Sequence, residues 1–158
     1  TYTSESLPKL RTRPVHYFDS TQLPYPCQQV FDLVADIERY PEFLRGWKQA
    51  RILVRNDNRL FVEQQLQTGP AVFLFHSTAL LEPCSGIQIT ANDGPFHDLQ
   101  IDWCFTPGDD GQCRMTVELN LAMKPGLVNG ALQLLLGSGS SELLPSFERR
   151  ARMLFSQT

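Results

Sequence analysis

The chain has 158 residues, of which 42% are hydrophobic, 20% charged and 10% aromatic, so its composition is that of a folded globular protein and not of a disordered or fibrous one. At this length we expect one domain with one core. The net charge of −3 argues against a broad basic surface for nucleic-acid phosphates, and we expect no DNA partner.

Residues 13–23 are predicted to form a strand that ends at the Pro24-Tyr25-Pro26 sequence. A helix follows, because Pro26 suits a first helical turn and apolar residues then recur at helical spacing. This apolar stripe consists of Cys27, Val30, Phe31, Val34 and Ile37. After it come Tyr40-Pro41-Glu42-Phe43-Leu44 and Trp47, an aromatic cluster around a proline that a simple helix does not need.

Residues 48–122 contain strand-like runs separated by turn sequences, which predicts an antiparallel meander. The six runs are 48–55, 59–67, 71–81, 87–91, 99–106 and 113–122. Alternation in the last two runs predicts two rows of apolar side chains on one face of the sheet, namely Leu99, Ile101, Trp103 and Phe105, and Met115, Val117, Leu119 and Leu121. Asp102 and Glu118 lie on the opposite faces of their strands, where we expect solvent.

A helical pattern returns after Pro125-Gly126 and predicts one long C-terminal helix over 127–155. A strand, a short helix, six antiparallel strands and a long helix describe an α+β fold, in which a curved sheet wraps around the C-terminal helix. A helix that does not fill the concave face leaves an elongated apolar cavity, and such cavities are common ligand sites.

The GSGSS run at 137–141 resembles two known motifs, a glycine-rich dinucleotide-binding motif and the GxSxG motif of hydrolases, but it matches neither. Glu142 stands where a third glycine is needed for the dinucleotide motif, and Gly139 replaces the serine of GxSxG. With Pro145 nearby, we interpret the run as an interruption or kink of the helix. The alternative is that its small side chains leave room for a ligand between helix and sheet.

Residues for metal binding or acid–base catalysis are not grouped in the sequence. His16, His76 and His97 lack metal-ligand spacing, and the acids are scattered singly apart from the Asp109-Asp110 turn, so we expect no metal site and no general acid–base pair. We interpret His76 as packed or solvated, with a hydrogen bond to a ligand carbonyl as the alternative. The arginines at 149–152 are interpreted as a solvated helix face, with contact to anionic lipid or a partner as the alternative.

The cysteines and the lack of long apolar segments predict the cell compartment. No stretch approaches the ~20 apolar residues that span a bilayer, and the first residues lack the apolar core of a secretory signal. The four cysteines form no CxxC pair, so we expect buried thiols in a reducing compartment. The prediction is a cytoplasmic protein, with peripheral contact at the inner membrane left open.

Three ordered motifs resemble the coenzyme Q-binding protein family of the START-like, polyketide cyclase/dehydrase superfamily: VFDLVADIERYPEFLRGW, DGPF before LQIDWCF, and SFERRARMLF. The similarity runs from about residue 14 to 155 and implies that residues 1–158 form a single START-like domain with the helix-grip (Bet v 1-like) fold. It also implies a deep cavity for a hydrophobic ligand. Members of that family are non-enzymatic lipid or quinone carriers, so the resemblance implies no catalytic residue and no enzyme activity. Some bacterial members carry the name ribosome association toxin.

The resemblance makes a carrier of a hydrophobic prenylated ligand the leading hypothesis, with ubiquinone as that ligand, no other cofactor, and a role in respiratory electron transport. One alternative is a ribosome-binding toxin that blocks association of the ribosomal subunits. The other is a polyketide cyclase/dehydratase-like enzyme, because one fold hosts several functions. The ribosome is the less favoured partner, since the chain is acidic and its basic clusters are short. A carrier would also contact a membrane surface transiently.

For the aromatic cluster after the first helix we hypothesise an apolar flap at the mouth of the cavity, and the competing interpretation is a plug that closes the end of the core. The predicted ligand-binding residues are Tyr40, Pro41, Phe43, Leu44, Trp47, Phe73, Phe75, Phe96, Trp103, Leu134 and Leu135. Buried polar side chains that converge in the cavity would favour an enzyme, whereas an apolar lining would favour a carrier.

Overall fold

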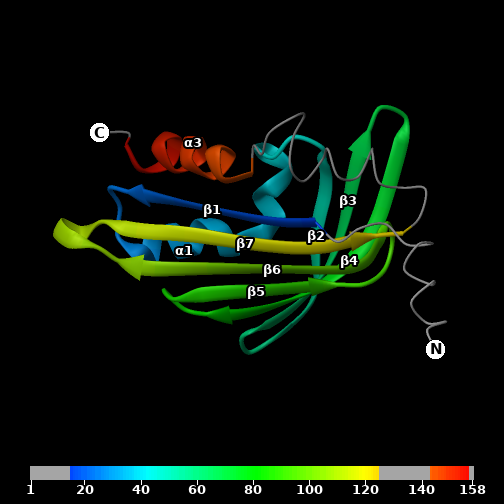
Figure 1. Cartoon of the computed structure of the whole chain (residues 1–158), viewed down its shortest axis with the longest axis horizontal. Coiled ribbons are helices and arrows are strands. Elements are labelled where there is room, and N and C mark those ends of the chain that lie inside the picture. The colour runs from blue at the N-terminus through cyan, green and yellow to red at the C-terminus, as the bar shows by residue number, and fades with distance from the viewer. Residues whose placement is uncertain (1–14, 125–142, 157–158) are drawn as a thin grey trace, which may run out of the picture.

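The computed structural model describes residues 15–124 and 143–156. They form one seven-stranded sheet, two α-helices and two short 3₁₀ helices (Figure 1). The elements are, in chain order, β1 (Val15–Leu23), α1 (Cys27–Ala35), η2 (Ile37–Glu42), β2 (Trp47–Asn56), β3 (Arg59–Thr68), β4 (Ala71–Glu82), β5 (Gly86–Ala91), β6 (Phe96–Pro107), η3 (Asp109–Gly111), β7 (Cys113–Met123) and α3 (Leu143–Phe155).

The sheet has the order β1-β7-β6-β5-β4-β3-β2, and every neighbouring pair is antiparallel. The strands from β2 to β7 are a simple meander, because each pairs with the next strand in the chain. The first strand closes the other side by pairing with the last, from Val15↔Leu121 to Leu23↔Cys113. The predicted α+β helix-grip fold is therefore confirmed.

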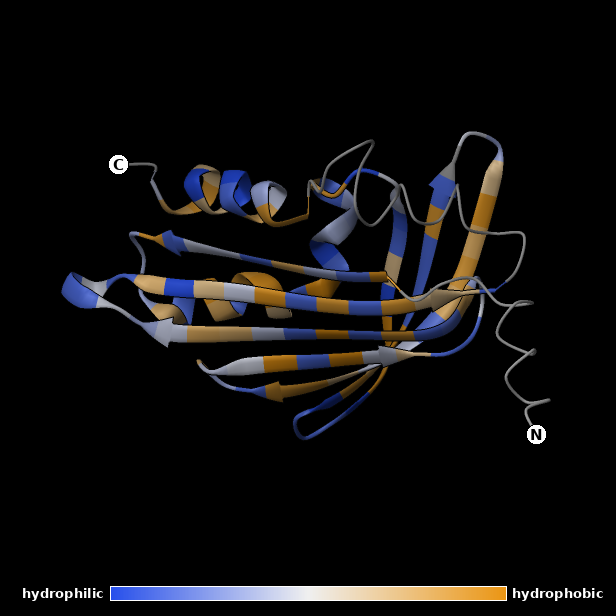
Figure 2. Ribbon diagram, in the orientation of Figure 1, coloured by the Kyte–Doolittle hydropathy of each residue, from blue (hydrophilic) through white to orange (hydrophobic). Residues whose placement is uncertain are grey.

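Hydropathy alternates along the strands, as Figure 2 shows, so the inner face of the sheet is apolar, whereas the outer face is mostly polar with some exposed apolar side chains such as Phe18 and Phe61. The two predicted apolar rows are confirmed on the inner face, where Ile101 is half-buried and the other seven side chains are buried. Asp102 and Glu118 lie on the outer face and are half-buried, and Glu118 pairs with His16 at 2.9 Å.

Both α-helices lie on the concave side of the sheet. The stripe predicted for the first helix is buried, with Cys27, Val30, Phe31 and Val34 in α1 and Ile37 in η2. In Figure 1, α1 lies behind β6 and β7, which it contacts, and α3 runs along β1 and also touches α1.

The C-terminal helix is confirmed over 143–155, and Pro145 lies in its first turn, where proline is tolerated. The predicted helical residues 127–142, with the GSGSS run and the predicted site residues Leu134 and Leu135, lie outside the described residues.

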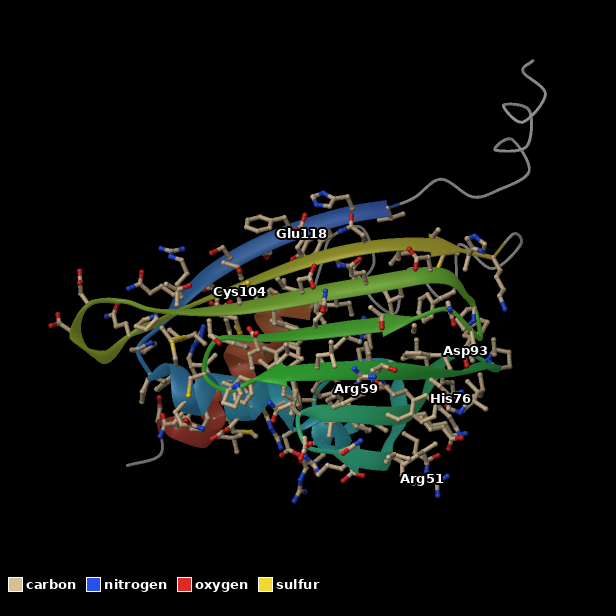
Figure 3. The ribbon with its side chains drawn as sticks, turned by 90° about the horizontal axis from the view of Figure 1, so that it is seen from below. Arg51, Arg59, His76, Asp93, Cys104 and Glu118 are labelled. Atoms are coloured by element: carbon tan, nitrogen blue, oxygen red, sulfur yellow. A yellow bond between two sulfur atoms is a disulfide. The ribbon has the colours of Figure 1, made fainter. Side chains whose placement is uncertain are left out.

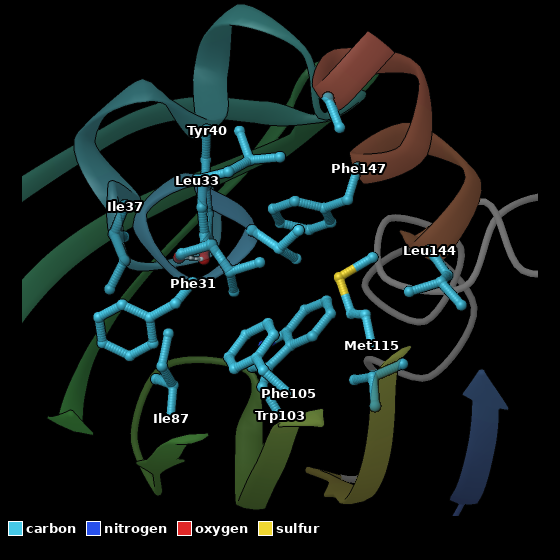
Figure 4. Packing of buried hydrophobic residues seen from close by; sticks show 14 of the residues in the cluster. Phe31, Leu33, Ile37, Tyr40, Ile87, Trp103, Phe105, Met115, Leu144 and Phe147 are labelled. Carbon is cyan, nitrogen blue, oxygen red and sulfur yellow. Dashed lines mark hydrogen bonds between the residues drawn. The ribbon is translucent and has the colours of Figure 1, made fainter. Parts of the chain in front are cut away.

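Buried apolar side chains form two clusters. The first, here called the helix-covered core, joins α1, η2 and α3 to the sheet and includes Phe31, Tyr40, Trp103, Phe105 and Phe147 (Figure 4). The second, here called the strand core, consists of Leu66, Phe75, Ala91, Phe96, Leu99, Leu119, Leu121 and Met123. All eight lie on strands, and the described helices contribute no residue to this cluster.

The prediction that the four cysteines are buried thiols is wrong. Cys27 and Cys113 form a disulfide with their Cα atoms 5.0 Å apart, which joins the start of α1 to the start of β7. Cys104 is exposed, because it lies on the outer face of β6, and Cys84 is half-buried. The bonded residues are 86 positions apart in the chain, and only the packing of α1 on the sheet brings them together. The cysteines therefore no longer support a reducing compartment.

No described helix is long and apolar enough to cross a membrane.

Candidate ligand-binding site

The aromatic cluster at 40–47 folds back on itself in two consecutive turns. The carbonyl oxygen of Tyr40 accepts hydrogen bonds from the backbone N–H groups of Phe43 and Leu44, at 3.1 and 2.8 Å. The Trp47 N–H donates to the Leu44 carbonyl oxygen at 3.2 Å. Tyr40 and Leu44 are buried, while Pro41, Phe43 and Trp47 are half-buried. The segment thus turns Tyr40 and Leu44 into the core and leaves Pro41, Phe43 and Trp47 at its rim.

Phe147 of α3 is the centre of an aromatic cluster that collects four predicted site residues. Its ring lies edge-on to Tyr40, Phe43 and Trp103, with centroids 5.4, 5.1 and 5.0 Å away. Tyr40 also packs edge-on against Trp47 at 6.1 Å. Figure 4 shows Tyr40, Trp103 and Phe147 converging from η2, β6 and α3. Phe147 lies in the predicted C-terminal helix, but the sequence did not predict this central role.

The Tyr40 hydroxyl is buried and donates to the Val34 carbonyl oxygen at 2.5 Å. Burial raises the pKa of this phenol above its ordinary value, and the nearby Asp36 carboxylate adds to the shift. Tyr40 is therefore a neutral anchor between α1 and η2 at physiological pH, and an unsuitable general base.

An arginine on α3 fastens η2 from the outside. Arg150 donates to Glu42 at 2.6 Å, and its guanidinium lies over the Phe43 ring at 5.1 Å from the centroid. Glu42 also accepts from Arg39 at 2.8 Å. The hydrogen bonds from Arg39 and Arg150 lower the pKa of the Glu42 carboxyl. Arg150 is thus a packed ion-pair partner, in contrast to the solvated face predicted for the arginine cluster, whereas Arg149 and Arg152 are exposed as predicted.

Phe75 and Phe96 form the centre of the strand core, with their rings edge-on at 5.0 Å. Phe73 is half-buried and packs against the same cluster. Trp47 packs against both cores, so it lies at the boundary between them. The structure therefore divides the described predicted site residues into a group around Phe147 and a group around Phe96, joined by Trp47.

The DGPF motif holds the turn between β5 and β6 against β4. The Asp93 carboxylate accepts a hydrogen bond from the His76 backbone N–H at 2.9 Å. Gly94 has a φ of +60°, and a Cβ added there would lie 2.2 Å from the Leu74 carbonyl oxygen, so the backbones approach too closely for any side chain. The motif then directs Phe96 into the strand core.

His76 lies half-buried on the outer face of β4, so the packed or solvated interpretation is confirmed, and its side chain does not point toward the inner face where the cavity was predicted. Its Nδ1 is 2.8 Å from Asp93, and Figure 3 shows these two residues beside each other. Its Nε2 is 3.3 Å from Glu63, and its ring stacks on Phe61 with the ring centroids 5.6 Å apart. The hydrogen bond with Asp93 is the main reason that the pKa of His76 is raised. The stacked rings line a surface hollow of about 410 Å³.

Two polar side chains, Gln64 and Ser77, are buried on the inner face at 5% and 2% exposure. The Trp47 indole N–H donates to the Gln64 Oε1 at 2.8 Å, and the Gln64 Nε2 donates to the Ser77 Oγ at 3.0 Å. The sequence carried a signal for Gln64, because it shares the inward row of β3 with Leu60, Val62 and Leu66.

Acidic, histidine and cysteine side chains do not gather into a metal-binding group anywhere in residues 15–124 and 143–156. In the same part of the chain the buried polar side chains are Gln64, Ser77 and Ser146, and none of them carries a charge. The inner face is therefore an apolar surface with one neutral polar spot on β3 and β4.

Comparison with protein families gives a match over residues 23–148 to the family described as polyketide cyclase / dehydrase and lipid transport. The chain belongs to this family. The START-like resemblance of the three sequence motifs is thereby confirmed.

Two proteins that are similar to this chain have names that indicate different functions. Ribosome association toxin RatA of Pseudomonas aeruginosa is 29% identical over 140 residues, covering 89% of this chain and 97% of the relative. Coenzyme Q-binding protein COQ10 homolog B, mitochondrial, of Xenopus laevis is 21% identical over 161 residues, covering 99% of this chain and 66% of the relative.

Solved structures show the same fold. A START superfamily protein from Mycobacterium smegmatis has a TM-score of 0.68 at 17% identity, covering 88% of this chain and 98% of that one. The Zhui aromatase/cyclase from a Streptomyces strain has a TM-score of 0.65 at 14% identity, covering 89% and 88%. At these identities the likeness concerns the fold alone.

Proposed function

We propose that the protein binds a hydrophobic prenylated ligand against the inner face of its sheet, with ubiquinone as the leading candidate, and carries it without changing it chemically. The observation that carries this proposal is the strand core, an apolar surface of eight buried side chains beside the helix-covered core. Apolar burial drives association without directional contacts, which suits a flexible prenyl chain. The name of the Xenopus laevis relative supports the choice of a quinone.

The chemistry of the buried side chains favours a carrier over an enzyme. General acid–base catalysis needs a group that exchanges protons near neutral pH. Among the described residues the buried non-aromatic polar side chains are one amide and two hydroxyls, and none of these does so unaided. The buried Tyr40 phenol has a raised pKa and is no better suited. A carrier of this kind would support respiratory electron transport by taking a quinone from a membrane surface and delivering it.

Binding should be driven by the tail of the ligand. Each buried CH₂ contributes roughly 0.8 kcal/mol, so about ten tail carbons contribute around 8 kcal/mol. Association costs about 4 to 15 kcal/mol, which a quinone ring with one or two hydrogen bonds of roughly 1 kcal/mol each does not offset. Titration with quinones that share a head group and carry zero to several isoprene units should therefore show affinity rising with the first units and then levelling. Equal affinity for the tailless quinone, or no binding by any of them, would contradict the proposal.

A second candidate is inhibition of ribosomal subunit association, and the RatA relatives favour it by name and by identity. A local feature also supports it. Residues 45–59 contain five basic residues and one acid, a net charge of +4 in a chain of net charge −3. The five are Arg45, Lys48, Arg51, Arg55 and Arg59, and all are exposed on or beside the edge strand β2. Such a strip can contact anionic RNA.

The second candidate is tested with ribosomal subunits on sucrose gradients. The protein should reduce subunit joining, and the double charge reversal Arg55→Glu with Arg59→Glu should restore it. Arg152→Glu, a reversal of an exposed arginine on α3, is the matched control. Unaltered joining at a large excess of protein would dismiss this candidate and leave the carrier proposal untouched.

A further inference from the structure

The hydrogen bonds of Gln64 fix the direction of its side-chain amide. The Trp47 indole nitrogen is a donor only, so the atom 2.8 Å from it must be the amide oxygen. The amide nitrogen then faces Ser77 and donates to its hydroxyl oxygen at 3.0 Å. The chain of bonds runs in one direction, from Trp47 through Gln64 to Ser77.

The direction of these hydrogen bonds leaves two donor groups, on Ser77 and Gln64, without an acceptor. Ser77 accepts through its oxygen and retains its O–H, and Gln64 retains the second N–H of its amide. Among the described residues neither group has another hydrogen-bond partner. Both side chains are almost fully buried, where a donor without an acceptor is costly because it has given up water.

The surroundings of these donors are apolar. On the paired strands Gln64 lies opposite Phe75, and Ser77 lies opposite Val62. Val62 belongs to the helix-covered core and Phe75 to the strand core, and Trp47 contacts both. The two donors therefore lie where the two cores meet, close to the surface that we propose for the ligand tail.

We infer that Ser77 and Gln64 form a donor site for a neutral hydrogen-bond acceptor of the ligand, such as a quinone carbonyl oxygen. A neutral acceptor fits because neither donor is charged and no charged side chain is buried in the described part of the inner face. The apolar remainder of the ligand would lie on the strand core. This inference rests on the proposed carrier function and adds the residues that select the head group.

The test compares two ligands in two variants. A prenylated quinone and a prenylated benzene with the same tail and no carbonyl are titrated by quenching of tryptophan fluorescence, with Trp47 and Trp103 as the reporters. Ser77→Ala should weaken quinone binding by about fivefold, the value of one neutral hydrogen bond, and leave binding of the benzene analogue unchanged. Thr78→Ala, which removes the next hydroxyl on the outer face of β4, is the matched control and should change neither.

A spectroscopic measurement separates a ligand contact from a purely structural role. The infrared carbonyl band of the bound quinone should lie at lower frequency than that of the free quinone in apolar solvent, and the shift should shrink in Ser77→Ala and stay in Thr78→Ala. Equal loss of affinity for both ligands, or an unchanged carbonyl band, would overturn the inference while the carrier function stands. If the unaltered protein binds neither ligand, the carrier function itself fails.

Discussion

The helix-covered core and the strand core use the same face of one sheet in different ways. The first is closed by aromatic rings from η2 and the residue that follows it, from β6 and from α3, which meet at Phe147, and a disulfide and the Arg150–Glu42 ion pair fasten it. The second is built from strands, and the turn that closes it is held by His76 and Asp93. We therefore expect the helix-covered core to contribute most to stability, whereas the strand core is the part that we propose for ligand contact.

The largest expected effect is in the helix-covered core. Phe147→Ala removes a fully buried ring that touches three other aromatic residues, and it should lower the free energy of unfolding by about 3 to 5 kcal/mol. Urea denaturation followed by tryptophan fluorescence measures this loss. Met153→Ala on the exposed face of α3 is the control and should stay within about 0.5 kcal/mol of the unaltered protein. Similar small losses for both variants would show that Phe147 does not hold this core together.

The next effect concerns the turn that closes the strand core. Gly94→Ala should cost about 1 to 2 kcal/mol for its left-handed backbone conformation, and more because the new Cβ meets the Leu74 carbonyl oxygen. Gly111→Ala separates the two causes, since Gly111 has a φ of +75° with nothing within 4 Å of the added Cβ. Thermal melts of the two variants measure the difference. Equal losses would mean that the turn does not press on β4.

Much of the fold that underlies these two cores could be predicted from the sequence, because alternation and helical periodicity indicate which face of a strand or helix is buried. The strands, the buried stripe of α1 and the inward rows of β6 and β7 follow from those patterns, and the family from three motifs. The burial of Gln64 could also be predicted, because it is a polar residue in an apolar row of β3.

Other features depend on contacts between distant segments. The Cys27–Cys113 bond joins residues that no local pattern relates, and the partners of His76 come from β3 and the β5–β6 turn. The position of Phe147 between η2 and β6 likewise depends on how α3 packs. Periodicity predicts burial, but it does not predict which buried or half-buried side chains meet.

A smaller effect is expected at the boundary of the helix-covered core. Phe43→Ala removes a half-buried ring, so it should lower stability by about 1 kcal/mol. If the 40–47 segment is a flap, the same variant should weaken binding of a prenylated quinone by about tenfold. If it is a plug, the remaining folded protein should bind normally. Fluorescence titration beside a thermal melt distinguishes the two, and Val72→Ala, an exposed apolar residue on β4, is the control.

The ion pair of the helix-covered core should make stability depend on acid pH. The pKa of Glu42 is below its ordinary value of 4.5 in the folded protein, so the unfolded chain binds more protons as the pH falls through this range. The stabilisation is present above pH 4.5 and lost as the pH falls through the lowered pKa. The melting temperature should therefore drop less between pH 5 and pH 3 in Glu42→Gln than in the unaltered protein. Identical slopes in both proteins would contradict this assignment.

The stability of the strand core should depend on pH in the opposite direction. The effect should be the smallest of these, because His76 lies on the accessible outer face. Asp93 raises the pKa of His76 above 6.5, so the folded protein holds a proton that the unfolded chain releases. This stabilisation is complete below pH 6.5 and is lost as the pH rises through the raised pKa.

Two variants isolate this contribution to the strand core. His76→Gln removes the titrating group, and Asp93→Asn removes the carboxylate while its side-chain oxygen can still accept the His76 backbone N–H. Both should flatten the decline in melting temperature above pH 6.5, whereas Thr90→Ala, which lines the same hollow without a titratable group, should leave it unchanged. If the decline persists in both variants, the His76–Asp93 pair does not fasten the turn. The turn would then depend on the hydrogen bond from the His76 backbone N–H to Asp93, on Gly94 and on the packing of Phe96.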